Sequence, residues 1–108
     1  MTSIERDSRT VVTVVGDLDV YTATTLQQHL GPLTAVDGAS IVIDLTSVPF
    51  IDSTGLGILV GALKHVREVG GRLDVVATSP RVIKVFTITG LDAVIALHPD
   101  LETALAAG

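Results

Sequence analysis

The hydroxyl of Ser53 is the side-chain group in this sequence best placed to take part in chemistry. Ser53 lies in the segment Asp52 to Gly57 (DSTGLG), directly before a helical apolar pattern. Backbone N–H groups and the positive end of a helix dipole accommodate a phosphate at such a position, so Ser53 is a candidate phosphoacceptor. Serine is also a favoured helix N-cap, worth about 1 kcal/mol, and spacing alone favours this structural role.

A second acidic segment, Gly16 to Asp19 (GDLD), lies where a predicted strand turns into the first helix. The loops that enter helices gather at one end of such a sheet, so we expect Asp17 and Asp19 at the same edge as Ser53. Carboxylates near a hydroxyl can bind Mg²⁺ or contact the basic groups of a partner. From the residues alone, a helix cap at Asp19 and a turn at Asp17 are the better interpretation.

Two enzyme-like motifs are incomplete in the same segment. The glycines at 55, 57 and 61 loosely resemble a dinucleotide-binding loop, but residues 46–54 separate them from the preceding strand, where that loop needs a tight turn. A serine hydrolase would have Gly-x-Ser-x-Gly around Ser53, and Ile51 occupies the place of the first glycine. Neither motif predicts catalysis.

The other groups able to bind metals or phosphate are dispersed. His29, His65 and His98 lie on different predicted elements without a His-x-x-x-His spacing, which predicts solvated helix or loop residues rather than a base or zinc ligands. Asp44, near a strand end, resembles the acceptor of a receiver domain. That interpretation lacks an acidic pair after the first strand and a lysine after the last.

Strands alternate with helices along the chain. The residues Thr10 to Val15 (TVVTVV) are β-branched and predict a strand, with Thr2 to Arg6 pairing as a hairpin arm across Asp7 and Ser8. A helix from Thr22 is expected to stop at Gly31-Pro32. The later elements follow from similar signals: a strand at Ile41 to Leu45, a helix from the Ser53 segment to Gly70-Gly71, a strand at Arg72 to Ala77, a helix from Ser79-Pro80 to Gly90, a strand at Val94 to Leu97, and a helix after Pro99-Asp100.

This order predicts one α/β domain over residues 1–108, with a mixed, mostly parallel sheet of about five strands and about four helices. Hydrophobic residues make up 47% of the 108, which excludes a disordered chain. The uncharged run Ser53 to Leu63 is shorter than the roughly 20 residues of a spanning helix, and the N-terminus has no secretory pattern. We therefore expect a cytoplasmic protein without a membrane segment.

Composition also limits the partners. The net charge is −5 with only seven Lys and Arg, which argues against direct nucleic-acid binding because phosphate contacts need clustered basic residues. The aromatic content of 3% leaves no platform for base stacking. The chain has no Cys, so disulfides, thiolate zinc sites and redox motifs are excluded.

Together, the motifs resemble a known family. The segments Gly16 to Asp19 and Asp52 to Gly57, followed by Gly70-Gly71, Ser79-Pro80 and Gly90-Leu91, occur in the order and spacing of anti-sigma factor antagonists, the STAS domain proteins. The likeness runs from about Thr10 to Leu105. DSTGLG before an apolar helix is its most specific part, and Asp17 stands where glutamate is more usual.

The resemblance implies a regulatory protein rather than an enzyme, with no catalytic residue, metal or cofactor. The unphosphorylated protein would bind an anti-sigma factor that is also a serine kinase and so release a sigma factor for stress-response or sporulation transcription. Phosphorylation at Ser53, or less often at Thr54, would end binding, and a serine phosphatase would reverse it. The partner-binding residues carried over from the family are Asp17, Asp19, Asp52, Ser53, Thr54, Gly55, Leu56 and Gly57. A small-ligand or nucleotide-binding STAS module is the alternative, and the oligomeric state stays open.

Overall fold

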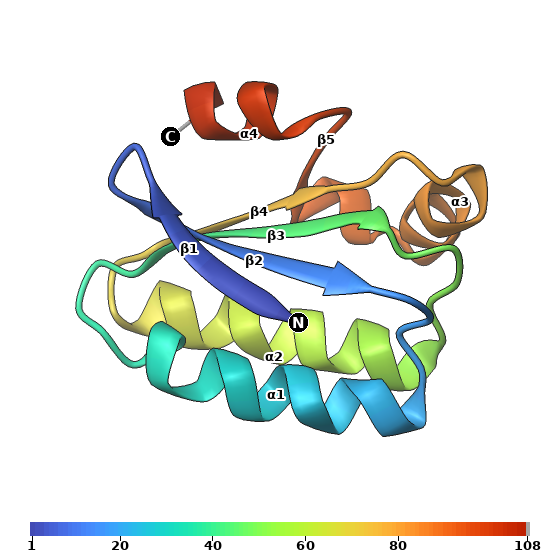
Figure 1. The fold of residues 1–108 in the computed structure, drawn as a ribbon, viewed down its shortest axis with the longest axis horizontal. Helices are drawn as coiled ribbons and strands as arrows, with labels where there is room; N and C mark the ends of the chain where they lie inside the picture. Colours follow the sequence, from blue (N-terminus) through green and yellow to red (C-terminus); the bar gives the residue numbers. More distant parts are fainter. Residues whose placement is uncertain (108) are drawn as a thin grey trace.

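Five strands form one sheet in the order β1-β2-β3-β4-β5 (Figure 1). The structure is a computed structural model that describes residues 1–107. Only β1 and β2 are antiparallel, and the other neighbouring pairs are parallel. The expected mixed, mostly parallel sheet is confirmed. The strands are β1 (Thr2–Arg6), β2 (Arg9–Val15), β3 (Ser40–Ser47), β4 (Arg72–Val76) and β5 (Ala96–His98).

The helices cover the two faces of this sheet unequally. Helices α1 (Val20–Thr34) and α2 (Ser53–Glu68) pack side by side on one face, and the short α4 (Leu101–Ala107) lies on the other (Figure 1). Helix α3 (Pro80–Thr89) and the 3-10 turn η1 (Leu91–Ala93) connect β4 to β5. None of the helices in residues 1–107 has both the length and the apolar character needed to cross a bilayer.

Two apolar clusters fill the space between these layers. The larger lies between the sheet and α1, α2 and α3, and it includes Val12, Ile43 and Phe86. The smaller lies beneath α4 and includes Val11 and Val42. Because successive strand residues point to opposite faces, β2 and β3 supply both clusters, which explains their nearly continuous apolar sequences.

Helix α1 corrects one prediction from the sequence. It does not stop at Gly31-Pro32 but continues to Thr34, with Pro32 inside its last turns. Proline removes the hydrogen bond of its own nitrogen and crowds the carbonyl four residues earlier, but the Pro32 ring is exposed and does not disturb the core. Leu33 packs against the larger cluster, and the buried Thr34 hydroxyl donates to the Gly31 carbonyl at 3.2 Å, so packing holds the final turn in place.

The last strand and its histidine also differ from expectation. Strand β5 covers Ala96–His98, two residues further along the chain than the predicted start at Val94, because η1 first occupies residues 91–93. His98 is not a solvated loop residue. Its side chain is 13% exposed, and Nε2 lies 2.9 Å from Asp74 Oδ1.

Asp74 forms the centre of a buried ionic cluster that the sequence pattern did not predict. Its side chain in β4 is fully buried, and Oδ2 accepts hydrogen bonds from Arg9 Nη2 at 2.6 Å and Arg72 Nε at 2.7 Å. The buried Arg9 also donates to the Ala104 carbonyl at 2.9 Å. This cluster therefore ties β2, β4, β5 and α4 together on one face of the sheet.

Candidate functional site

The two acidic segments lie side by side at the edge of the sheet where β2 and β3 end. The backbone N–H of Leu18 donates to the Phe50 carbonyl at 2.9 Å, and the N–H of Asp52 donates to the Leu18 carbonyl at 3.2 Å. Leu18 and Ile51 form an isolated parallel bridge between the loops that enter α1 and α2. The expectation that Asp17 and Asp19 share an edge with Asp52 and Ser53 is confirmed.

Asp52, not Ser53, is the N-cap of α2. Its Oδ1 accepts hydrogen bonds from the N–H groups of Thr54 at 2.9 Å and Gly55 at 3.1 Å. Ser53 is the first residue of the helix and is exposed, and its hydroxyl makes no hydrogen bond within the described residues. The interpretation of Ser53 as a capping residue is therefore wrong. The cap leaves the Ser53 hydroxyl free at the positive end of the helix.

Asp19 caps α1 in a similar way. Its Oδ1 accepts from the N–H groups of Tyr21 at 3.0 Å and Thr22 at 3.1 Å, and these contacts, the Thr22 bond foremost, lower the Asp19 pKa below 3.8. Asp19 is therefore a carboxylate at neutral pH. Only Oδ1 carries these bonds, so Oδ2 remains available to a partner.

Thr22 is a site-forming residue that the sequence interpretation missed. Its hydroxyl accepts from the Asp19 N–H at 2.9 Å and donates to the Asp17 carbonyl at 2.6 Å. These bonds complete a capping box and fix the loop that carries both carboxylates. The signal was present in the Asp-x-x-Thr spacing, which places a hydroxyl three residues after an N-cap.

The glycines and the leucine of the segment have different placements. Gly55 and Leu56 are buried, whereas Thr54 and Gly57 are exposed. A Cβ atom on Gly55 would lie 2.8 Å from both Cγ and the carbonyl oxygen of Leu18. Gly55 thus permits the close approach of the two loops. A Cβ atom on Gly57 would have nothing within 4 Å, so the surface at this position is open.

We expect Gly55→Ala to lower the free energy of unfolding by about 1–3 kcal/mol, because the methyl group would collide with the Leu18 backbone. Gly57→Ala is the matched control. Nothing lies within 4 Å of its added Cβ, so alanine should be neutral or stabilise the helix by up to about 1 kcal/mol. Urea unfolding of both variants measures the difference. Equal changes in the free energy of unfolding for the two variants would show that the Leu18 and Gly55 segments can separate without cost.

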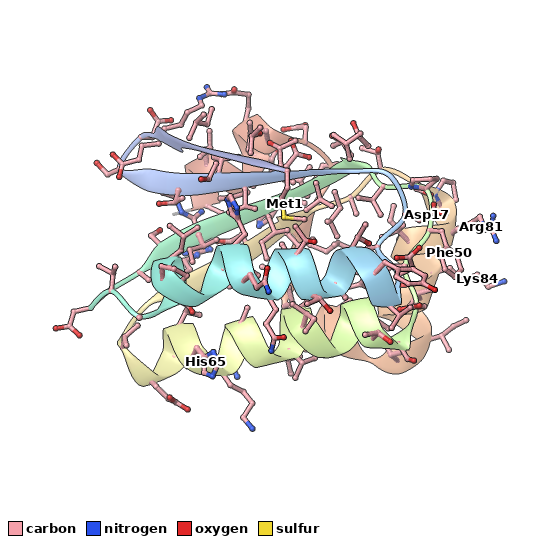
Figure 2. The ribbon with its side chains drawn as sticks, turned by 60° about the horizontal axis from the view of Figure 1, so that its bottom comes forward. Met1, Asp17, Phe50, His65, Arg81 and Lys84 are labelled. Carbon is pink, nitrogen blue, oxygen red and sulfur yellow. The ribbon has the colours of Figure 1, made fainter. Side chains whose placement is uncertain are left out.

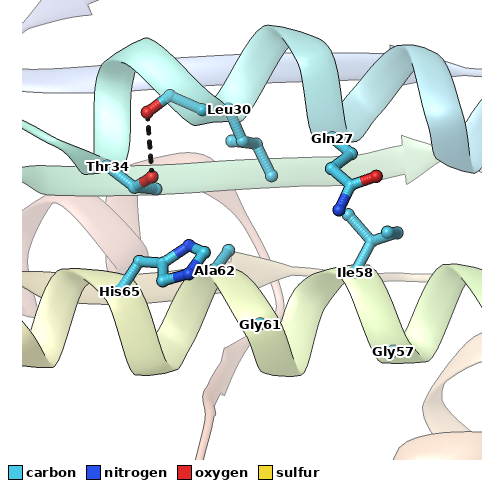
Figure 3. A pocket seen from close by; sticks show the side chains of 9 residues that line it. Gln27, Leu30, Thr34, Gly57, Ile58, Gly61, Ala62 and His65 are labelled. Atoms are coloured by element: carbon cyan, nitrogen blue, oxygen red, sulfur yellow. Dashed lines mark hydrogen bonds between the residues drawn. The ribbon is translucent and has the colours of Figure 1, made fainter.

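A groove lies between α1 and α2, and Gly57 of the Ser53 segment is among its lining residues (Figure 3). Its volume is about 90 Å³, well below the roughly 300–1,000 Å³ typical of ligand pockets. The groove is lined by Gln27, Leu30, Gly31, Thr34, Gly57, Ile58, Gly61, Ala62 and His65. Among residues 1–107, no group of three or more His, Asp or Glu side chains is arranged to hold a metal ion. The neighbouring loops that carry Asp17, Asp19 and Asp52 make the surface around Ser53 acidic.

Known proteins resemble this chain in sequence. The chain is 45% identical over 91 residues to a protein of Bacillus subtilis (strain 168) named anti-sigma-B factor antagonist, covering 84% of this chain and 83% of that protein. It is 39% identical over 92 residues to the protein of the same name from Listeria monocytogenes serovar 1/2a, covering 84% of this chain and 81% of that one.

Solved structures share the fold. The crystal structure of an anti-sigma factor antagonist from Mycobacterium paratuberculosis has a TM-score of 0.89 at 36% identity and covers 98% of this chain and 90% of its own. SpoIIAA of Bacillus, solved in a phosphorylated form, has a TM-score of 0.73 at 22% identity, covering 99% of this chain and 98% of its own, and shares the fold.

The mixed five-stranded sheet, with two helices on one face, has the architecture of a STAS-like α/β domain. The family model described as "STAS domain" matches residues 1–104 of this chain. The chain belongs to the STAS domain family.

Proposed function

We propose that this protein is an anti-sigma factor antagonist controlled by phosphorylation of Ser53. In its unphosphorylated form it binds an anti-sigma factor that is also a serine kinase, and a serine phosphatase restores this form after phosphorylation. The observation that carries the proposal is the exposed Ser53 hydroxyl at the start of α2, which makes no hydrogen bond within the described residues. It lies near the loops that carry Asp19 and Asp52. The names of the relatives from Bacillus and Listeria support the antagonist role.

The transfer itself needs little from this chain. The Ser53 oxygen attacks the γ-phosphorus of ATP bound to the kinase, the bond to the β-phosphate oxygen breaks, and ADP leaves. A base on the kinase takes the hydroxyl proton. This chain contributes the Ser53 hydroxyl oxygen, which makes no hydrogen bond within the described residues. The helix terminus that carries it is fixed by the Asp52 cap.

The switch acts through charge at the interface. A phosphate changes the net charge from −5 to between about −6.5 and −7. The fold tolerates this charge, because the helix dipole and free N–H groups of the first turn favour anions. The partner places basic groups over Asp19 and Asp52, and its active site already holds nucleotide phosphates. In the complex, these phosphates strongly repel the new phosphate on Ser53. We place this exchange of partners in the cytoplasm, where it would control sigma-factor-dependent transcription in a stress or sporulation response.

The test is release by ATP. We expect the wild-type protein to be pulled down by its anti-sigma factor kinase and released when ATP is added, with phosphate on Ser53 by mass spectrometry. Ser53→Ala should stay bound, because the variant loses only a hydroxyl that makes no internal bond in the described structure. Thr54→Ala is the matched control for the minor alternative site, and it should be released like the wild type. ATP-dependent release of Ser53→Ala would contradict the assignment of Ser53.

A further inference from the structure

Helix α3 presents a second face that points away from the core and carries both apolar and cationic side chains. Val82 and Phe86 are buried in the larger cluster, whereas Arg81, Lys84 and Ile88 are exposed. Ile88 is 72% exposed, so its side chain is available to a partner. The spacing of residues 81, 84, 85 and 88 places them on one side of a helix.

Phe50 extends this face toward the Ser53 loop. Its ring is 39% exposed, and the Arg81 guanidinium carbon lies 5.8 Å from the ring centroid. Together with α3 it borders a shallow cavity of about 290 Å³. This cationic–apolar face, as we call it below, is lined by Phe50, Ile51, Arg81, Lys84, Val85 and Ile88. Phe50, Arg81 and Lys84 lie at the same end of the molecule as Asp17 (Figure 2).

Within residues 1–107, no salt bridge neutralises the two cations of this face. The salt bridges of the described residues use Arg6, Arg9, Arg72 and His98, and none involves Arg81 or Lys84. Lys64 and Arg67 are also absent from these salt bridges, but Arg81 and Lys84 border the same cavity as the exposed Phe50 ring. A surface of this composition is complementary to a carboxylate-bearing segment with an apolar side chain.

We propose that the cationic–apolar face is a second contact for the anti-sigma factor, and that it receives an acidic segment carrying an exposed apolar residue. This inference rests on the proposed function. The face is continuous with the Ser53 edge, because Phe50 lies three residues before Ser53 and its carbonyl accepts from Leu18. Two adjacent patches of opposite sign define how the partner must be oriented: basic groups over Asp19 and Asp52, acidic groups over Arg81 and Lys84.

The experiment measures binding of the unphosphorylated protein to its anti-sigma factor kinase by surface plasmon resonance without ATP. Lys84→Glu should weaken binding about tenfold, mainly through slower association, and the loss should shrink as salt is raised from about 0.05 to 0.5 M. Ile88→Ala should speed dissociation several-fold, because it removes an apolar contact.

Lys64→Glu is the matched control. Lys64 is exposed and is absent from the same salt bridges, and its substitution by Glu changes the net charge by the same amount as Lys84→Glu. Lys64 lies eleven residues after Ser53 in α2, about 16 Å away along the helix axis. It should alter affinity less than twofold. Equal losses for Lys64→Glu and Lys84→Glu would overturn the proposal, since a general charge effect would then account for both.

Two further outcomes separate this inference from the function on which it rests. If Ser53→Asp loses binding while Lys84→Glu and Ile88→Ala bind like the wild type, the second contact is overturned and the switch stands. If the wild type does not bind the kinase at all, both are overturned. A wild-type chain that elutes alone as a dimer, and as a monomer after Ile88→Ala, would assign the face to a second copy and overturn the proposal.

Discussion

Phosphorylation of Ser53 should lower affinity for the anti-sigma factor kinase by about a thousandfold, while the melting temperature stays nearly constant. A new dianion on Ser53, next to Asp52 and near the loop of Asp19, costs several kcal/mol in the complex, and about 4 kcal/mol corresponds to a thousandfold. The fold does not oppose the phosphate. Asp52 keeps its own hydrogen bonds to Thr54 and Gly55, so the modified side chain replaces no structural contact.

Ser53→Asp should reproduce part of this loss. A carboxylate has one charge and fewer acceptor oxygens than a phosphate, so we expect about a tenfold to hundredfold effect. Isothermal titration calorimetry with the kinase, and thermal unfolding of the same samples, provide the two measurements. Full affinity together with a large fall in melting temperature would show that Ser53 acts on folding rather than on the interface.

The proximity of the two acidic segments could be predicted from the sequence because each segment follows a strand and precedes a helix. In a mostly parallel sheet, such loops meet at one edge, and Asp17 and Asp52 indeed lie on neighbouring loops. The assignment of the cap was less secure. Asp52 and Ser53 are adjacent and both residue types favour the N-cap, so only the backbone geometry shows that Asp52 fills the position and leaves Ser53 free.

Errors arose where packing outweighed a local signal. Gly31-Pro32 is a strong stop signal, yet α1 continues to Thr34 because Leu33 packs against the core and Thr34 is buried. The role of Gly55 depends on the nearby Leu18 backbone, which belongs to another loop. Such long-range neighbours are not visible in the periodicity of a single segment.

The ionic cluster of Asp74 was missed for the same reason. Arg9 and Asp74 are 65 residues apart, and within β4 the aspartate stands between the apolar residues Leu73 and Val75. The structure shows that β2 and β4 both flank β3, so the long Arg9 side chain reaches across the central strand beneath α4. A buried charge needs partners of this kind, because an unpaired one would be expelled or neutralised.

Asp74→Ala should lower the free energy of unfolding by about 3–5 kcal/mol, since it leaves the buried Arg9 guanidinium without its carboxylate. This is a large part of the roughly 5–15 kcal/mol that stabilises a typical domain. Urea unfolding measures the loss. Arg6→Ala is the control, because Arg6 pairs with Glu102 on the surface and should contribute less than about 1 kcal/mol.

The same cluster predicts how stability depends on pH. Burial raises the pKa of Asp74, but hydrogen bonds from two arginines and His98 outweigh burial and lower it to about 2, from an ordinary value of 3.8. Between these pH values the unfolded chain binds more protons than the folded one. The contribution of Asp74 is therefore complete above about pH 4 and is lost as the pH falls toward 2. Asp74→Asn should lack this part of the acid transition, whereas an unchanged transition would show that other carboxylates account for acid unfolding.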